Sequence, residues 1–357
     1  MIRTPENENR IVVGISQGDI NGISYEVIIK SCLDQRILEL FIPVVYGFTK
    51  VASFHRKLLN IPDFSFNIIH RAEQASLKRP NLINLNDREV KIDLGESTQL
   101  AGELSLLSIN AAIEDLKKGA IDVLVTGPIN KNNVQSATNE VFTGHTEYLA
   151  SMLGATDQLM LMVSGSLRIG LVTGHIPLGE VAQAISIERI LQKLALMEAS
   201  LLQDFAIRKP RIAVLGLNPH AGDHGLLGNQ EQEIILPAIK KASSEGMLVF
   251  GPYPADGFFA SRQYQQFDGI LAMYHDQGLI PFKTLAFENG VNFTAGLPYV
   301  RTSPDHGTAF DIAGKDLASP DSMRAAIYLA CDIYNNRLMW NEINKNPLAI
   351  GKMEKES

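Results

Sequence analysis

The sequence predicts an α/β fold with a largely parallel sheet, and two observations support this. The first is a set of short runs rich in β-branched residues, which end at Gly, Pro or polar residues and are typical of strands buried on both faces. These runs are Ile11–Ile15, Val44–Tyr46, Val123–Thr126, Ile169–Thr173, Ile212–Leu217 and Ile270–Tyr274. The second is a set of intervening segments whose apolar residues recur at intervals of three and four, as in amphipathic helices. These segments are Glu103–Lys118, Ser186–Phe205, Gln230–Ser244 and Asp321–Tyr334. Strands that alternate with helices favour a parallel sheet.

Composition limits the possible functions. Of 357 residues, 45% are hydrophobic, so the chain can bury the core of one large domain or of two. A formal net charge of −7 argues against a nucleic-acid partner, because such proteins carry a surplus of Lys and Arg. No apolar run is long enough to cross a membrane, so we expect a cytoplasmic protein without membrane contact. Cys32 and Cys331 lack metal-binding spacing and are expected to be buried thiols.

Polar residues gather where four of the predicted strands end. In open α/β sheets, ligands bind beyond the carboxyl ends of the strands. Each cluster taken alone could be an ordinary loop, but four together favour a ligand site. The clusters are Thr126–Lys131, Thr173–His175, Asn218–His220 and Tyr274–Gln277.

Three histidines, His175, His220 and His275, follow directly after predicted strands. Their positions predict that they meet at one edge of the sheet, where neutral imidazoles could bind a divalent metal and leave positions open for substrate. Asp256 and Asp276 could orient an imidazole or hold metal-bound water. Asp256 precedes a glycine, so a plain turn residue is an equally good interpretation of it.

A second group of residues suits a phosphate or carboxylate. Arg301 can bind an oxyanion with two parallel hydrogen bonds, Lys283 supplies a point charge, and Asn292 lies between them in sequence. His145 and Thr146 precede an apolar helical pattern, and a helix N-terminus is a natural anion site. Simple capping by Thr146 explains the same residues equally well.

The glycine-rich segment Asn218–Glu231 leads into a helix but does not follow the GxGxxG pattern, and the chain has no GxxxxGK[ST] motif. A nucleotide-binding enzyme of the common Rossmann or P-loop type is therefore disfavoured.

Eight ordered motifs, which together span nearly the whole chain, resemble the family of 4-hydroxythreonine-4-phosphate dehydrogenases. The segment Asp305–Lys315 is also similar to the cofactor loop of isopropylmalate and isocitrate dehydrogenases, which bind NAD without GxGxxG. The resemblance implies two α/β domains with a cleft between them. Residues 1–135 together with 306–357 would form the cofactor side, and 136–305 the metal, substrate and dimer side. The motifs are Gly18–Glu26, Thr126–Lys131, Gly144–Glu147, Gly174–Leu178, Gly216–Gly222, Pro254–Asp256, Tyr274–Gly278 and Gly296–Ala309.

The resemblance also implies roles for individual residues in a homodimer with shared active sites. The metal, Zn, Mg or Co, would bind His175, His220 and His275, with His175 from one subunit and the other two from its partner. Lys283 and Asp256 are the candidate catalytic residues. The substrate-binding positions are His145, Thr146, Lys283, Asn292 and Arg301. The positions that would contact NAD or NADP are His306, Gly307, Thr308, Ala309 and Asp311.

One motif departs from the family. Its first motif usually reads GDPAGIGPE, whereas this chain has Ile20, Asn21, Ser24 and Tyr25 in place of Pro, Ala, Gly and Pro. The family pattern therefore does not predict the backbone shape of this loop, although no predicted ligand-binding residue lies in it.

The implied reaction is oxidation of 4-phosphooxy-L-threonine by NAD, followed by decarboxylation to 3-amino-2-oxopropyl phosphate in pyridoxal 5'-phosphate (vitamin B6) synthesis. A dehydrogenase of 4-phospho-threonate or 4-phospho-erythronate is the alternative within this class. From other classes, a phosphate acyltransferase has a related fold but needs no metal-binding histidines, and a non-catalytic protein that binds phosphorylated metabolites would not need all three kinds of site.

Overall fold

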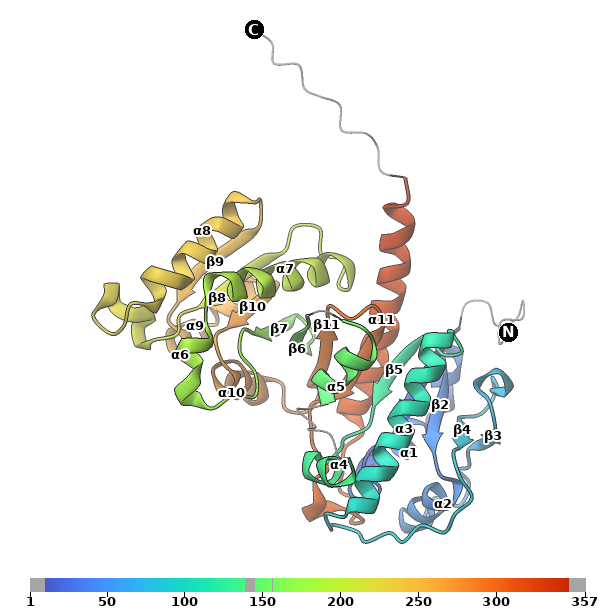
Figure 1. Cartoon of the computed structure of the whole chain (residues 1–357). Coiled ribbons are helices and arrows are strands. Elements are labelled where there is room, and N and C mark those ends of the chain that lie inside the picture. The colour runs from blue at the N-terminus through green and yellow to red at the C-terminus, as the bar shows by residue number, and fades with distance from the viewer. Residues whose placement is uncertain (1–9, 139–144, 156, 347–357) are drawn as a thin grey trace.

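The computed structural model describes residues 10–138, 145–155 and 157–346, without the side chains of 145–147. These residues form one sheet of 12 strands in the order β3-β4-β2-β1-β5-β12-β11-β6-β7-β10-β8-β9 (Figure 1). The strands are β1 (Ile11–Ser16), β2 (Phe41–Gly47), β3 (Asn67–Ile69), β4 (Asn81–Asn84), β5 (Val123–Thr126), β6 (Leu159–Ser164), β7 (Leu167–Leu171), β8 (Arg211–Leu215), β9 (Leu248–Tyr253), β10 (Gly269–Ala272), β11 (Val291–Ala295) and β12 (Val300–Pro304).

Helices follow most of the strands. They are α1 (Ser24–Ser31), α2 (Thr49–Leu58), α3 (Gln99–Lys118), α4 (Lys131–Ala137), α5 (His145–Met152), α6 (Val181–Ala184), α7 (Ile187–Gln203), α8 (Leu236–Ser244), α9 (Ala255–Ala260), α10 (His275–Leu285) and α11 (Asp321–Ile343), with short turns η4 (Pro219–Gly225), η5 (Glu231–Ile235) and η7 (Phe310–Ile312).

The predicted α/β fold is confirmed, and each of the six predicted strands is present. The pairings β6–β7, β6–β11 and β11–β12 are antiparallel, and the other pairings within the described residues are parallel. Six strands have no counterpart among the predicted ones: β3, β4, β6, β9, β11 and β12. Several of these lie at the sheet edges or carry polar residues, so they lack a continuous apolar run.

Local sequence explains where the long helices begin and end. The Thr98 side chain caps α3 by accepting a hydrogen bond from the Ala101 N–H, and Gly119 ends the same helix with a left-handed φ of 70°. The Ser186 side chain caps α7 in the same way through the Arg189 N–H. These caps satisfy backbone groups that a helix end leaves unpaired.

Alternate residues of each strand point to opposite faces of the sheet and build separate hydrophobic cores. Ile11, Val13 and Ile15 of β1 belong to a core that is completed by α1, α7, α8 and α11. Val12 belongs to a core on the other face, which α3 and α5 cover. A third core joins β7, β8 and β10 to α9 and α10.

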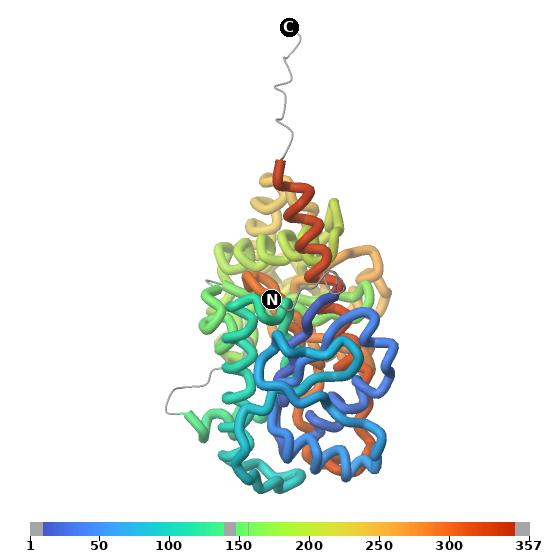
Figure 2. The backbone as a smooth tube through the Cα atoms, turned by 90° about the vertical axis from the view of Figure 1, so that its right-hand side faces the viewer, coloured from blue at the N-terminus to red at the C-terminus, as the bar shows by residue number. Residues whose placement is uncertain are grey.

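The sheet continues across the boundary predicted between two domains, because β12 pairs with β5. Figure 1 shows a blue-to-teal half with α1, α2 and α3 beside a yellow-to-orange half with α8, α9 and α10. The 1–135 with 306–357 and 136–305 boundaries remain a prediction. In Figure 2 the red end of α11 extends beyond both halves, and its last turns carry exposed Leu338, Met339 and Ile343.

The two cysteines and the helices can be compared with the predictions made from composition. Cys32 is buried and Cys331 partly buried, both are free thiols, and burial raises the pKa of each to about 12. Among the described residues, no helix combines the length and the apolar character that a bilayer crossing requires.

Candidate active site

Strands β7, β10 and β8 are parallel neighbours, so their carboxyl ends meet at one edge of the sheet. His175 lies in the loop after β7, and His275 is the first residue of α10, directly after β10. Their ring centroids are 5.4 Å apart. The strand ends thus bring two of the three predicted histidines together. Both rings line a cavity of about 500 Å³ with Ile176, Leu178 and Tyr274.

The neighbours of His275 fix its orientation. Its Nδ1 lies 2.7 Å from Asp276 Oδ1, which leaves Nε2 as the nitrogen available to a ligand. The Gln277 side chain accepts from the Met273 N–H at 2.7 Å and donates to the Gly216 carbonyl at 2.6 Å. Because Gly216 follows β8, this amide ties the start of α10 to the loop that carries His220.

His220 lies in an unusual left-handed turn after β8. The φ angles of residues 220–224 all lie between 42° and 79°, and only Gly222 of these five is a glycine. Left-handed backbone costs roughly 1–2 kcal/mol for each non-glycine residue. The buried Glu231 carboxylate offsets part of this cost by accepting from the Leu217 and Asn218 backbone N–H groups, each at 2.7 Å, and from the Asn218 side chain.

Two imidazoles beside a carboxylate are a donor set that suits a borderline divalent metal such as zinc. Within the described part of a single chain, however, no three His, Cys, Asp or Glu side chains come together as a metal site. His220 therefore does not complete a three-histidine site with His175 and His275 of the same chain in this conformation.

The predicted anion group lies on the central strands. Arg301 of β12 is buried and donates to the hydroxyls of Thr126 at 2.6 Å and Thr294 at 3.2 Å. Asn292 and Thr294 are two residues apart on β11, so their side chains share the face that Arg301 contacts. Asn292 Oδ1 is buried without a hydrogen-bond partner among the described residues; this oxygen accepts only from a donor group, whereas the amide nitrogen of Asn292 can donate to an oxyanion.

Asp305 is a residue that sequence reasoning missed. The Lys283 ammonium lies 3.5 Å from Asp305 Oδ1 and 3.4 Å from its carbonyl oxygen. Asp305 is anchored by its own N–H, which donates to the Gly290 carbonyl at 3.1 Å. Burial raises the pKa of its carboxyl group, and the nearby positive charge of Lys283 lowers it. The carboxylate therefore holds Lys283 at the start of the predicted cofactor segment.

We expect Asp305→Asn to reduce kcat/KM for the phosphorylated acid by about tenfold, because Lys283 loses the charge that positions it. The measurement is a double-mutant cycle with Lys283→Met. If Asp305 acts through Lys283, Asp305→Asn has little further effect in the Lys283→Met background. Fully additive losses would show that the two residues act independently.

The predicted cofactor segment 306–311 packs on the first motif. The Thr308 carbonyl accepts from the Ile23 N–H at 3.0 Å, and a Cβ on Gly22 would come within 2.6 Å of that oxygen, so only glycine permits this approach. His306 Nε2 is buried without a partner among the described residues, and burial lowers the pKa of its imidazole. Gly307 and Asp311 are exposed.

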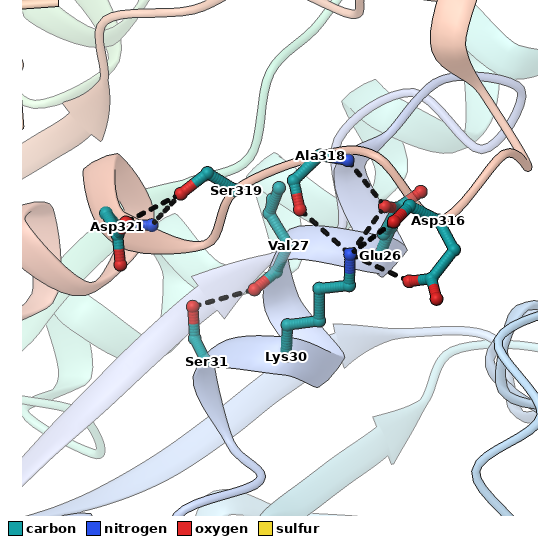
Figure 3. A network of polar contacts seen from close by, with 8 residues as sticks. All are labelled: Glu26, Val27, Lys30, Ser31, Asp316, Ala318, Ser319 and Asp321. Carbon is teal, nitrogen blue, oxygen red and sulfur yellow. Dashed lines mark hydrogen bonds and ion pairs between the residues drawn. The ribbon is translucent and has the colours of Figure 1, made fainter. Parts of the chain in front are cut away.

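A polar network holds the segment that follows the cofactor segment on α1 (Figure 3). The Lys30 ammonium lies 2.8 Å from both Glu26 Oε1 and Asp316 Oδ1, and donates to the Ala318 carbonyl at 2.9 Å. The Ala318 N–H donates back to Glu26 Oε1 at 2.8 Å. Residues 306–318 are thus fastened at their start by Asp305 and at their end by α1.

The family model described as pyridoxal phosphate biosynthetic protein PdxA matches residues 39–330. The chain belongs to the PdxA family. It is 52% identical to 4-hydroxythreonine-4-phosphate dehydrogenase of Bacteroides thetaiotaomicron over 98% of this chain and 95% of that protein. The crystal structure of 4-hydroxythreonine-4-phosphate dehydrogenase from Klebsiella pneumoniae superposes with a TM-score of 0.79 at 36% identity, covering 92% of this chain and 98% of that one. A putative D-threonate 4-phosphate dehydrogenase of Oceanobacillus iheyensis is 38% identical over 90% of this chain and 97% of that protein. Membership in the PdxA family and these dehydrogenase relatives identify the chain as an oxidoreductase of pyridoxine biosynthesis.

The departure from the PdxA first motif gains a structural explanation. The Asn21 side chain donates to the Glu96 carbonyl and the Thr98 hydroxyl, each at 3.0 Å, and accepts from the Asp93 N–H. Asn21 thereby fixes the segment 93–98 against α1. Tyr25 is also integrated, because its hydroxyl donates to Gln17 Oε1 at 2.8 Å.

Three other site residues expected from the PdxA resemblance are Asp256, His145 and Thr146. Asp256 is exposed in the first turn of α9, and its side chain makes no hydrogen bond or ion pair with the described residues. The chain therefore does not bring Asp256 to Lys283. His145 and Thr146 lie in the first turn of α5, but their side chains are outside the described part of the chain.

Four residues of this PdxA-family site escaped sequence reasoning as site residues: Lys131, Glu231, Gln277 and Asp305. Lys131 and Gln277 stood in strand-end clusters, and Asp305 stood inside a recognised motif, so each had a signal. Glu231 had no signal beyond its place at the end of a glycine-rich segment. Lys131 Nζ lies 3.4 Å from His175 Nε2.

Proposed function

We propose that this chain oxidises 4-hydroxythreonine-4-phosphate with a nicotinamide dinucleotide and decarboxylates the product to 3-amino-2-oxopropyl phosphate, in pyridoxal 5'-phosphate synthesis. The observation that carries the proposal is that α10 links the two predicted ligand groups. His275 begins this helix and Lys283 lies eight residues later, about 12 Å along the axis and about 80° around it. One substrate can therefore reach a metal-binding imidazole and an anion-binding ammonium.

The roles of the residues follow from the parts of the substrate. A divalent metal, Zn, Mg or Co, bound at the histidines would lower the pKa of the substrate hydroxyl and stabilise the alkoxide from which hydride leaves. Arg301 and Asn292 would hold the phosphate on the central strands, with His145 and Thr146 beside it. The hydride goes to the nicotinamide and the hydroxyl proton to solvent, which leaves a β-keto acid. When carbon dioxide leaves, the electron pair moves to the neighbouring carbon, and a proton must be delivered there.

Lys283 and Asp256 remain the candidates for delivering that proton. The ion pair of Lys283 with Asp305 favours Lys283, because the side chain of Asp256 is exposed and has no hydrogen bond or ion pair among the described residues. The nicotinamide dinucleotide, NAD or NADP, would lie along 306–311. Three features fit such a ligand: the buried His306 Nε2 that lacks a partner among the described residues, the open surface at Gly307 and the exposed carboxylate of Asp311.

A second substrate, D-threonate 4-phosphate, is supported by the relative of that name at 38% identity. The two acids differ at the carbon next to the carboxylate, where one carries an amine and the other a hydroxyl. The test is reduction of NAD and NADP with purified enzyme and each acid, followed as nicotinamide absorbance. The proposal expects the highest kcat/KM with 4-hydroxythreonine-4-phosphate. A preference for the threonate would overturn the choice of substrate, and reduction with neither acid would overturn the proposed function.

We also propose a homodimer with active sites shared between subunits. The support is the pair formed by His175 and His275, which lacks a third ligand among the described residues of its own chain. Ile176 and Leu178, which are 37% and 73% exposed, border that pair and offer an apolar surface to a second copy. Contact between these rings favours His175 and His275 from one chain with His220 from the partner, rather than the division predicted from the sequence.

Mixing His175→Ala with His220→Ala subunits should restore activity to two inactive proteins, because each heterodimer then keeps one complete site. Random exchange makes half of the dimers heterodimeric, so recovery should approach roughly a quarter of wild type. A mixture of His175→Ala with His275→Ala separates the two divisions. It recovers nothing if one chain supplies both residues, and recovers like the first mixture if different chains supply them. No recovery in either mixture, with subunit exchange verified, would contradict shared sites.

A further inference from the structure

Lys131 brings a positive charge from the first half of the sheet to the histidines of the second half. It is the first residue of α4, at the end of the loop that follows β5. Its side chain is exposed, and Nζ lies 3.4 Å from His175 Nε2. His175 belongs to the loop after β7, which is separated from β5 in the sheet by β12, β11 and β6. Lys131 therefore spans the space between the two halves.

The backbone that carries Lys131 is firmly held. Asn130 caps α4 by accepting from the Asn132 and Asn133 N–H groups. The Asn133 side chain donates to the buried Asp19 carboxylate at 2.7 Å. A Cβ on Gly102 of α3 would lie 2.0 Å from the Asn133 carbonyl, so α3 and α4 are in close contact through this glycine. The position of Lys131 is thus set by packing, although its side chain is exposed.

Among the residues that the structure describes, no negative charge neutralises Lys131. No carboxylate of the described residues forms an ion pair with it, and its hydrogen bond there is to His175. Two other lysines near buried structure do have such a partner: Lys30 has Glu26, and Lys193 has Asp157. A hydrogen bond to a neutral imidazole nitrogen leaves the full positive charge of the ammonium in place, so an anionic group of a ligand can still pair with it.

A divalent cation on His175 would repel the Lys131 ammonium, because like charges a few ångströms apart raise each other's energy. An anionic oxygen between them converts this repulsion into two attractions. The substrate of the proposed function carries two anionic groups, a phosphate and a carboxylate. Arg301 and Asn292 already provide for the phosphate and Lys283 for the proton, which leaves the carboxylate without an assigned partner.

We propose that Lys131 binds the substrate carboxylate beside the metal and is a specificity-determining residue for the acid. This inference rests on the proposed function for the identity of the substrate, but its charge argument concerns His175 and Lys131 alone. Binding of the acid would draw Lys131 from His175 to the carboxylate, and loss of carbon dioxide would remove the group it holds. The decarboxylated product should therefore bind without its help.

The experiment uses Lys131→Met and Lys131→Arg in the full-length enzyme, with Lys118→Met on the exposed surface of α3 as the matched control. The first arm measures Zn²⁺ and Co²⁺ binding to the metal-free protein by calorimetry, with no substrate. Removing the like charge should tighten metal binding in Lys131→Met by about three- to tenfold and leave Lys118→Met unchanged. Unchanged or weaker metal binding in Lys131→Met overturns the proposal.

The second arm compares the substrate with its product. Lys131→Met should raise KM for the phosphorylated acid by about tenfold or more, while the inhibition constant of 3-amino-2-oxopropyl phosphate, which lacks the carboxylate, stays within about twofold. Lys131→Arg should recover part of the loss. Equal weakening of acid and product would place Lys131 on the phosphate and overturn the assignment. If the wild-type enzyme does not oxidise the acid, the proposed function fails, and the metal arm still decides whether Lys131 opposes the cation.

Discussion

Chelation of the divalent metal is expected to reduce turnover by more than about a thousandfold, and readdition of metal should restore it, because the substrate hydroxyl then loses the charge that stabilises its alkoxide. His175→Ala and His275→Ala should lose both metal occupancy and rate, since each removes one imidazole of the adjacent pair. Occupancy is measured by elemental analysis of the purified protein and rate by nicotinamide absorbance.

Two further variants are controls for the loss of metal and activity in His175→Ala and His275→Ala. Asp276→Asn keeps both imidazoles but weakens the hydrogen bond to His275 Nδ1, so its loss should be milder, about tenfold. His70→Ala removes an exposed histidine outside the site and should leave metal and rate unchanged. Full activity of His175→Ala and His275→Ala in the presence of chelator would contradict the metal assignment.

Arg301→Lys should reduce kcat/KM for the phosphorylated acid by about a hundredfold or more and leave KM for the nicotinamide cofactor nearly unchanged. Lysine keeps the charge but cannot reproduce the guanidinium donors that contact Thr126 and Thr294 while presenting a planar pair of N–H groups to an oxyanion. The measurement is steady-state kinetics with each substrate varied in turn, together with a thermal melt.

The melt is needed because Arg301 is buried, and any substitution there lowers stability. Arg337→Lys is a matched control, since Arg337 is also largely buried and pairs with Asp204 at 2.6 Å, outside the proposed site. The control should lose stability without a change in substrate KM. If Arg301→Lys raises the KM of cofactor and acid equally, Arg301 supports the fold or the cofactor instead of the phosphate.

The predictable part of the fold was the part with a simple apolar pattern. Strands β1, β5 and β10 are buried along their whole length, so each appears in the sequence as an apolar run. Strands β11 and β12 contain Asn292, Thr294, Arg301 and Thr302, and these polar residues interrupt the pattern. Strands β11 and β12 were thus hidden in part by Asn292, Thr294 and Arg301, which belong to the proposed site.

Contacts within the site were predictable to a similar extent. His175 and His275 lie close together because each follows a parallel strand and the ends of these strands meet. The sequence indicates this arrangement, since both histidines come directly after predicted strands. The left-handed turn at His220 follows residues whose N–H groups donate to the carboxylate of Glu231, 11 residues beyond His220 in the chain, and no local pattern specifies such a turn. The Asp305 contact with Lys283 joins residues 22 positions apart through the fold alone.

Hydride transfer from the substrate carbinol carbon to the nicotinamide is the central claim, and deuterium at that carbon tests it most directly. The wild-type enzyme with metal, 4-hydroxythreonine-4-phosphate deuterated at C3 and oxidised cofactor should yield one deuterium per reduced nicotinamide and one carbon dioxide per reduced cofactor, both measured by mass spectrometry. Reduced cofactor without deuterium, or carbon dioxide released without cofactor reduction, would contradict the account.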